Sequence, residues 1–113
     1  MLLAAEAPRD ELATTLREQI RRPECMAGAA FALASLGDRE AVPYLMHMIR
    51  YGLDPAAGYL GLGRLKATET VVALRRTSRP MQPREGAAAA WALGEAGGEA
   101  AEALLLELLD HAL

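Results

Sequence analysis

The residues that could bind a metal ion are few, and the chain's two histidines come first. His47 and His111 hold equivalent places in two copies of a repeated pattern, two repeats apart. Helices in successive layers lie about 8–10 Å apart, so these side chains would be on the order of 20 Å from each other. One ion cannot bridge that distance. We therefore expect no metal site.

Other catalytic patterns are equally weak. Cys25 has Glu24 beside it and no obvious base, which favours a buried or incidental thiol over a reactive one. The glycine-rich stretch GYLGLG at 58–63 does not have the order GxGxxG and follows no strand, so helix packing explains it better. Glu99 and Glu102 fit the acidic first turn of a helix. We expect a protein that is not an enzyme and that needs no cofactor.

A threefold repeat organises the chain. The stretch at 29–45, AAFALASLGDREAVPYL, returns at 58–74 and 89–105, with shifts of 29 and 31 residues. The matched apolar positions are Phe31, Leu60 and Trp91; Leu33, Leu62 and Leu93; Leu36, Leu65 and Ala96; and Leu45, Leu74 and Leu105. We expect Trp91 to fill the largest apolar slot. The small residues between them are Ala32, Gly61 and Ala92, and Ala34, Gly63 and Gly94. Such residues let helix backbones approach closely, so each copy predicts two helices stacked on the next two.

The first copy contains signals for where its helices begin and end. Its Ala-rich part has high helix propensity. Gly37 then predicts a helix stop and Asp38 a cap for the next helix. Pro43 is tolerated only in the first turn of that second helix. The core-facing stripe of the second helix would be Val42, Leu45 and Ile49.

The N-terminal segment predicts a capping helix. Leu12, Leu16 and Ile20 are spaced i, i+4 and i+8 and form one stripe, which predicts a helix that ends before Pro23. Leu16 lies 29 residues before Leu45, which is one repeat length. This helix is therefore interpreted as the second helix of an incomplete unit. The sequence thus predicts an all-α fold, a short α-solenoid of about three helix-pair repeats plus an N-terminal capping helix. We divide this single domain, 1–113, into a cap helix at 1–22 and repeats one to three at 24–51, 54–79 and 84–113.

Two stretches of the chain resemble a known repeat family. AAFALASLGDREAVPYL and AAAAWALGEAGGEAAEALL are similar to the short HEAT-like repeats of phycocyanobilin lyase subunits and of many bacterial scaffold proteins. The second stretch has Gly98 where the first has Asp38, and the middle copy has Lys66-Ala67 in place of Gly-Asp. The resemblance covers roughly residues 24–110 and implies a helical solenoid. It implies little about activity, because members of the family share shape rather than chemistry.

Composition favours one soluble, cytoplasmic domain. The chain has 113 residues, 52% of them hydrophobic, and its opening MLLAAEAP is too short and lacks the basic flank of a signal peptide or membrane span. With a single cysteine, no internal disulfide is possible.

Charge is distributed unevenly. Residues 50–84 carry seven basic and two acidic side chains, whereas residues 85–113 carry six acidic and no basic ones. The basic band could bind phosphate, nucleic acid or an acidic protein segment, or it could pair with acids of a neighbouring repeat or another copy of the chain. A pI near 5.4 argues against nucleic acid. Only five aromatic residues are available for base stacking. We expect a protein partner.

Helical geometry predicts which side chains such a partner would contact. If Val42, Leu45 and Ile49 face the core, the opposite face carries residues spaced i, i+3, i+4 and i+7. In solenoids of this kind the second helices line the concave surface, and Tyr, Met and Arg are typical of protein-binding faces. The alternative is that the tyrosines only cover a neighbouring join. The predicted partner-binding residues are Tyr44, His47, Met48, Tyr51, Arg75, Arg76, Arg79, Leu104, Glu107 and Leu108.

The last helix contains more leucine than one buried stripe requires. Its leucines are Leu104, Leu105, Leu106, Leu108 and Leu109. This excess fits either a packed terminal helix or an interface with a partner or a second copy of the chain.

Three functions stay open at this point. The favoured one is a non-enzymatic interaction or scaffold module anchored by Tyr44, His47, Tyr51 and Arg76. The resemblance implies a second, a chromophore lyase or its partner subunit, which would need a larger array and a tetrapyrrole pocket. The third is binding to the nucleic-acid backbone, and it would use Arg50, Arg75, Arg76 and Arg79.

Overall fold

The computed structural model describes residues 2–77 and 80–112, with side chains for 9–77 and 80–110. Its elements are α1 (Leu2–Gln19), α2 (Met26–Ser35), a short 3-10 helix (Arg39–Ala41), α3 (Val42–Tyr51), α4 (Pro55–Arg64), α5 (Glu69–Arg76), α6 (Pro83–Ala96) and α7 (Glu99–Ala112). Within the described ranges no residue belongs to a strand. The predicted all-α class is confirmed.

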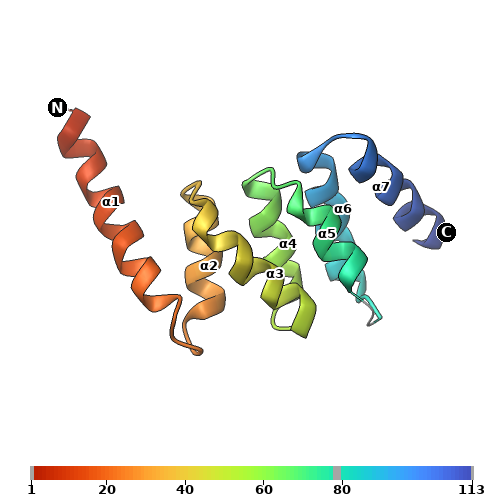
Figure 1. Ribbon diagram of the computed structural model, residues 1–113, viewed down its shortest axis with the longest axis horizontal. Coiled ribbons are helices and arrows are strands. Elements are labelled where there is room, and N and C mark those ends of the chain that lie inside the picture. The colour runs from red at the N-terminus through yellow and green to blue at the C-terminus, as the bar shows by residue number, and fades with distance from the viewer. Residues whose placement is uncertain (1, 78–79, 113) are drawn as a thin grey trace.

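The helices stack as three successive pairs. The first helices of the pairs, α2, α4 and α6, contact one another in order, and the second helices, α3, α5 and α7, do the same (Figure 1). The molecule is elongated, with principal extents of 51 × 30 × 19 Å. This is the predicted solenoid of three helix pairs, preceded by α1. No helix in the described part of the chain is both long and apolar enough to cross a membrane.

The turn between α2 and α3 has the predicted chemistry. Gly37 has a left-handed φ of 81°, and the Asp38 carboxylate accepts a hydrogen bond of 2.9 Å from the Glu40 N–H. Pro43 is the second residue of α3, where no intrahelical bond is lost. In repeat two, Lys66 replaces the glycine and adopts a positive φ of 50°.

The core lies between the two helix layers. Val42, Leu45 and Ile49 are all buried, as predicted. Glycines in α4 let the helices approach closely. A Cβ on Gly58 would lie 2.9 Å from the Leu45 carbonyl oxygen, and one on Gly61 would lie 2.6 Å from a Leu45 methyl carbon. The GYLGLG stretch therefore serves helix packing, which confirms the interpretation from sequence.

Two large apolar side chains are more exposed than expected. Trp91 does not fill an enclosed slot: it is 42% exposed, and the edge of its ring lies against Gly63 of α4. Leu12 was expected on the buried stripe of the cap helix but is 49% exposed. Among the described side chains of α1 and the residue that follows it, Leu16 and Ile20 are buried in the core and Ala13 packs against it (Figure 1).

Ion pairs link successive units along one edge of the array. Arg17 of α1 pairs with Asp38 at 2.8 Å and with Glu40 at 3.1 Å. The hydrogen bond and the charge of Asp38 raise the pKa of Arg17. Arg39 of repeat one donates to both carboxylate oxygens of Glu69 in repeat two, at 2.9 and 2.7 Å. A hydrogen bond from its own backbone N–H, and then the contact with Arg39, lower the pKa of Glu69.

Candidate functional site

The surface formed by α3 and α5, here called the second-helix face, carries four of the ten predicted partner-binding residues, Tyr44, His47, Tyr51 and Arg76. His47 and Tyr51 of α3 are exposed, and Tyr44 is half-buried. Arg76, on the last turn of α5, is also exposed. These four side chains come from two repeats, and the fold brings them onto one side of the molecule.

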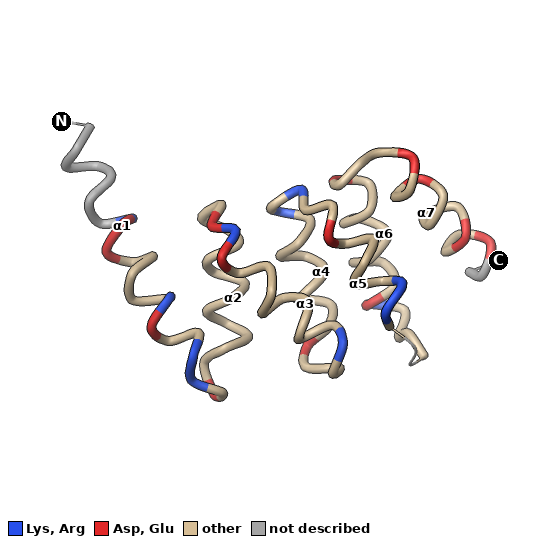
Figure 2. The backbone as a smooth tube through the Cα atoms, viewed as in Figure 1, with Lys and Arg blue, Asp and Glu red and all other residues tan. Residues whose placement is uncertain are grey.

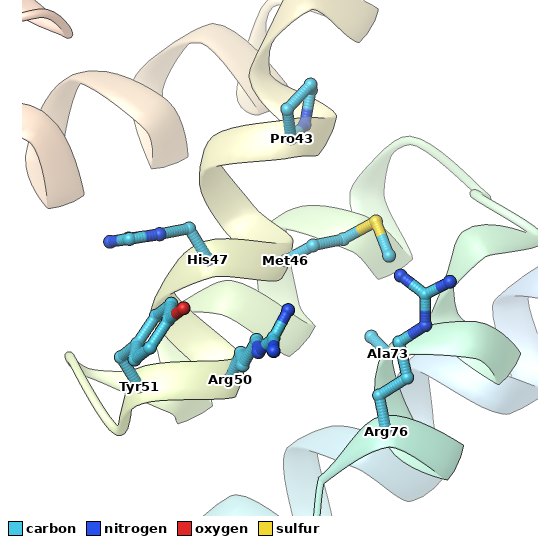
Figure 3. A pocket seen from close by; sticks show the side chains of 7 residues that line it. All are labelled: Pro43, Met46, His47, Arg50, Tyr51, Ala73 and Arg76. Atoms are coloured by element: carbon cyan, nitrogen blue, oxygen red, sulfur yellow. The ribbon is translucent and has the colours of Figure 1, made fainter.

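A hollow of about 290 Å³ lies between α3 and α5. Its lining residues are Pro43, Met46, His47, Arg50, Tyr51, Ala73 and Arg76. Figure 3 shows Met46 reaching from α3 toward the Arg76 side chain of α5, with Arg50 below it. Two guanidinium groups from different repeats therefore border one concavity.

The Tyr51 ring is held between two neighbours on its own helix. Its centroid lies 4.6 Å from that of His47, with the rings tilted by 48°. The Arg50 guanidinium carbon lies 5.5 Å from the same ring, within cation–π range. Because these contacts fix the ring while leaving it 58% exposed, Tyr51 offers a positioned aromatic surface to a ligand.

A second hollow lies beside the first, toward the end of α1. It has a volume of about 450 Å³ and is lined by Ile20, Arg21, Pro23, Met26, Tyr44, His47 and Leu53. His47 borders both hollows, and in Figure 3 its ring points away from α5. No acidic residue lines either hollow, whereas Arg21, Arg50 and Arg76 do. The pair of hollows suits a ligand with negative charge and some apolar surface.

Met48 is a correction to the predicted site. Its side chain is fully buried in the core rather than displayed opposite Leu45 and Ile49. Helix α3 is contacted by α2, α4 and α5, so its buried stripe is wider than three residues predict. Met48, at i+3 from Leu45, falls within that stripe.

Leu104 is a second correction. It is only 7% exposed and belongs to a small core cluster with Leu93 and Ala101. Helix α7 contacts α5 and α6, and its inward stripe is Ala101, Leu104 and Leu108, spaced i, i+3 and i+7. The register carried over from α3 is therefore shifted by one position in α7.

The other predicted residues do not join the α3–α5 hollow. Arg75 is exposed on α5 but lines neither hollow. Glu107 is exposed and Leu108 half-buried on α7, at the C-terminal end of the array. Arg79 lies outside the described residues. His111, which the sequence argues against as a metal ligand, has no described side chain. Among the side chains that are described, no three of His, Cys, Asp or Glu gather closely enough to share a metal ion.

Four residues that line the hollow are absent from the predicted partner-binding set: Pro43, Met46, Arg50 and Ala73. The sequence places Arg50 in the basic band and among the possible nucleic-acid contacts. Met46 and Arg50 both belong to α3. Their i, i+4 spacing places them on one side of α3, and this signal could have identified them.

Two stretches of the chain match a known protein family. Residues 27–50 and 87–111 match the family described as PBS lyase HEAT-like repeat. The first match covers most of α2 and α3, and the second covers most of α6 and α7. The divergent middle repeat lies between the two matches. Neither a curated protein nor a solved structure matches the chain.

Proposed function

We propose that this chain, whose repeats one and three are HEAT-like repeats of the PBS lyase type, is a non-catalytic interaction module that binds an acidic protein segment on its second-helix face. Stacked helical repeats create extended surfaces that bind partners along several repeats at once. The residues on this face belong to α3 and α5, so a bound segment would cross the junction of repeats one and two.

One observation carries the proposal. Arg50 and Arg76, on different helices, line the same hollow, and none of its lining residues is acidic. Guanidinium groups bind carboxylates through paired N–H donors, and uncompensated basic side chains attract an acidic partner and speed its association.

The hollow also has apolar side chains, which would contact apolar residues of the bound segment. Tyr51 is exposed with its ring held by His47 and Arg50, and Met46 also lines the hollow. Tyrosine and arginine are enriched among residues that dominate binding energies at protein interfaces. A segment that carries an apolar residue flanked by Asp or Glu would use both features. It could continue over His47 into the hollow that Tyr44 lines.

Charge reversal at neighbouring arginines tests the site. Arg76 lines the hollow and Arg75 does not, so Arg76→Glu and Arg75→Glu make the same change in net charge at adjacent positions. A partner would be captured from the source lysate by cross-linking and identified, and its acidic segment would be titrated against each purified variant. We expect Arg76→Glu to weaken binding about 10- to 100-fold, equivalent to about 1.4–2.8 kcal/mol, and Arg75→Glu to weaken it less than threefold.

Three outcomes would contradict this assignment. Equal losses in both variants would show that only net charge matters, and unchanged binding in both would place the site elsewhere. A captured partner that is nucleic acid, with affinity falling steeply with salt for any sequence, would also replace the proposal.

A further inference from the structure

We propose that repeat three carries a second docking site, independent of the second-helix face, in which the groove between α6 and α7 binds a basic amphipathic helix. The groove has a volume of about 520 Å³. Its walls include Met81, Ala87 and Ala90 on the α6 side and Leu108 and Leu109 on α7. Ala87 and Leu109 are exposed, so the groove is open to solvent.

The repeat register shows what fills such a groove. In repeat two, α6 packs along α4, and the α4 residues Ala56, Tyr59 and Gly63 are all buried. A shift of 31 residues maps them onto Ala87, Ala90 and Gly94 of α6. Ala87 and Gly94 are exposed, and Ala90 is half-buried. The same face is thus covered by a helix in repeat two and uncovered in repeat three.

Gly63 and Gly94 show the difference most directly. The Trp91 ring of α6 lies against Gly63, at the place where a Cβ would stand. A Cβ built on Gly94 meets nothing within 4 Å. A helix similar to α6 would fit this uncovered surface. Such a helix carries small residues and one large apolar side chain, which would lie over Gly94.

The acidic residues of α7 indicate which kind of helix would bind in the groove. Glu102 precedes Leu106 and Leu109 on one stripe of α7, spaced i, i+4 and i+7, and Asp110 follows. Leu106 is 65% exposed and Leu109 is 50% exposed. Residues 85–113 hold six acids and no base, and Figure 2 shows acidic positions along α7. Two such acidic ends facing each other would repel, which disfavours a second copy of the chain joined end to end. The same charge favours a partner helix with lysines or arginines beside its apolar stripe.

A peptide with the sequence of α6 itself is a suitable probe. A fluorescein-labelled peptide of residues 82–97, carrying Glu85→Lys and Glu95→Lys, is both basic and able to place its tryptophan over Gly94. We expect it to bind the full-length chain, as measured by anisotropy, at least 10-fold more tightly than the unsubstituted peptide. Trp91→Ala within the basic peptide should also weaken binding at least 10-fold.

Matched variants of the protein locate the site. Ala87→Arg fills the groove and repels a basic helix, and we expect it to weaken binding at least 10-fold. Ala100→Arg makes the same change at an exposed position of α7 that does not line the groove, and it should change affinity less than twofold. Arg76→Glu, which tests the second-helix face, should leave peptide affinity within twofold, so the two proposals can fail separately.

Several results would overturn the inference. These are no binding of the basic peptide, equal affinity for the two peptides, or equal effects of Ala87→Arg and Ala100→Arg. Sedimentation equilibrium supplies another, because a dimer that Ala87→Arg dissociates would make a second copy of the chain the occupant.

Discussion

Single arginine side chains join successive units of this molecule. Arg17 reaches from α1 to Asp38 and Glu40, and Arg39 reaches from repeat one to Glu69 of repeat two. The corresponding position of repeat three is Ala100, which cannot accept such a contact. Exposed ion pairs add little to stability, because water and salt screen the two charges. These pairs connect α1 to repeat one and repeat one to repeat two.

Glu69 makes the stability of the chain depend on pH, because a hydrogen bond from its own backbone N–H and then the contact with Arg39 lower its pKa. The folded pKa of Glu69 is lowered, so its contribution is present above the unfolded value of about 4.3 and is lost as pH falls through the folded value. A double-mutant cycle with Arg39→Ala and Glu69→Gln, followed by urea denaturation, should give a coupling of about 0.5–1 kcal/mol at pH 7. The coupling should be smaller at pH 3 than at pH 7, because a larger share of Glu69 is then protonated. A coupling that is equal at both pH values would contradict this assignment.

Helix α4 is the element on which the packing of the array depends. Its glycines at 58 and 61 lie against α3, and Gly63 lies against α6, so one helix contacts two neighbours through positions without a Cβ. Helix α6 keeps the glycine at position 94 but has no helix beyond it in the described structure. Glycine therefore allows close helix packing at position 63 of α4, whereas a Cβ at position 94 of α6 would meet no neighbouring atom within 4 Å.

Alanine substitutions should reveal this difference. Gly58→Ala would place a Cβ 2.9 Å from the Leu45 carbonyl oxygen, a backbone atom that cannot easily move. We expect the free energy of unfolding to fall by about 1–3 kcal/mol, because overpacking exceeds the gain in helix propensity. Gly94→Ala meets no atom and should raise the free energy of unfolding by about 0.5–1 kcal/mol. Thermal and urea unfolding of both variants provide the measurement, and equal effects would rule out the packing explanation.

The whole molecule is extended rather than spherical. Its radius of gyration is 14.9 Å, compared with about 13 Å for a compact domain of about 100 residues. Each helix contacts only helices near it in the array, so stability accumulates from neighbouring interfaces. Helix α4 contacts α2, α3, α5 and α6. Among the described helices, α1 packs on α2, and it reaches the turn before α3 through the ion pairs of Arg17.

Amide hydrogen exchange should be slowest in the helices that contact the most neighbouring helices. Amides of α4 should exchange at least 100-fold more slowly than those in the N-terminal half of α1, a difference of about 2.7 kcal/mol in opening free energy. Helix α7, which contacts α5 and α6, should be intermediate. Native-state exchange measured by NMR tests this order. Uniform protection in all helices would indicate instead that the array unfolds as one cooperative unit.

Much of the fold could be predicted from local signals in the sequence. Gly37 and Asp38 mark the end of one helix and the cap of the next because these signals act over a few residues of backbone. The stripe of Val42, Leu45 and Ile49 predicts a core-facing side because helical periodicity alone fixes which residues share a face. The repeat register then extended this description to the other helices, and it was enough to predict a solenoid.

The tertiary structure decided how much of each helix is covered. Met48 is buried because three helices surround α3, and Leu104 is buried because α7 turns a different stripe toward α6. The hollow between α3 and α5 likewise joins Arg50 to Arg76 only when two repeats stack. Periodicity determines where a residue lies around its own helix, whereas burial and shared sites depend on which neighbouring helices approach it.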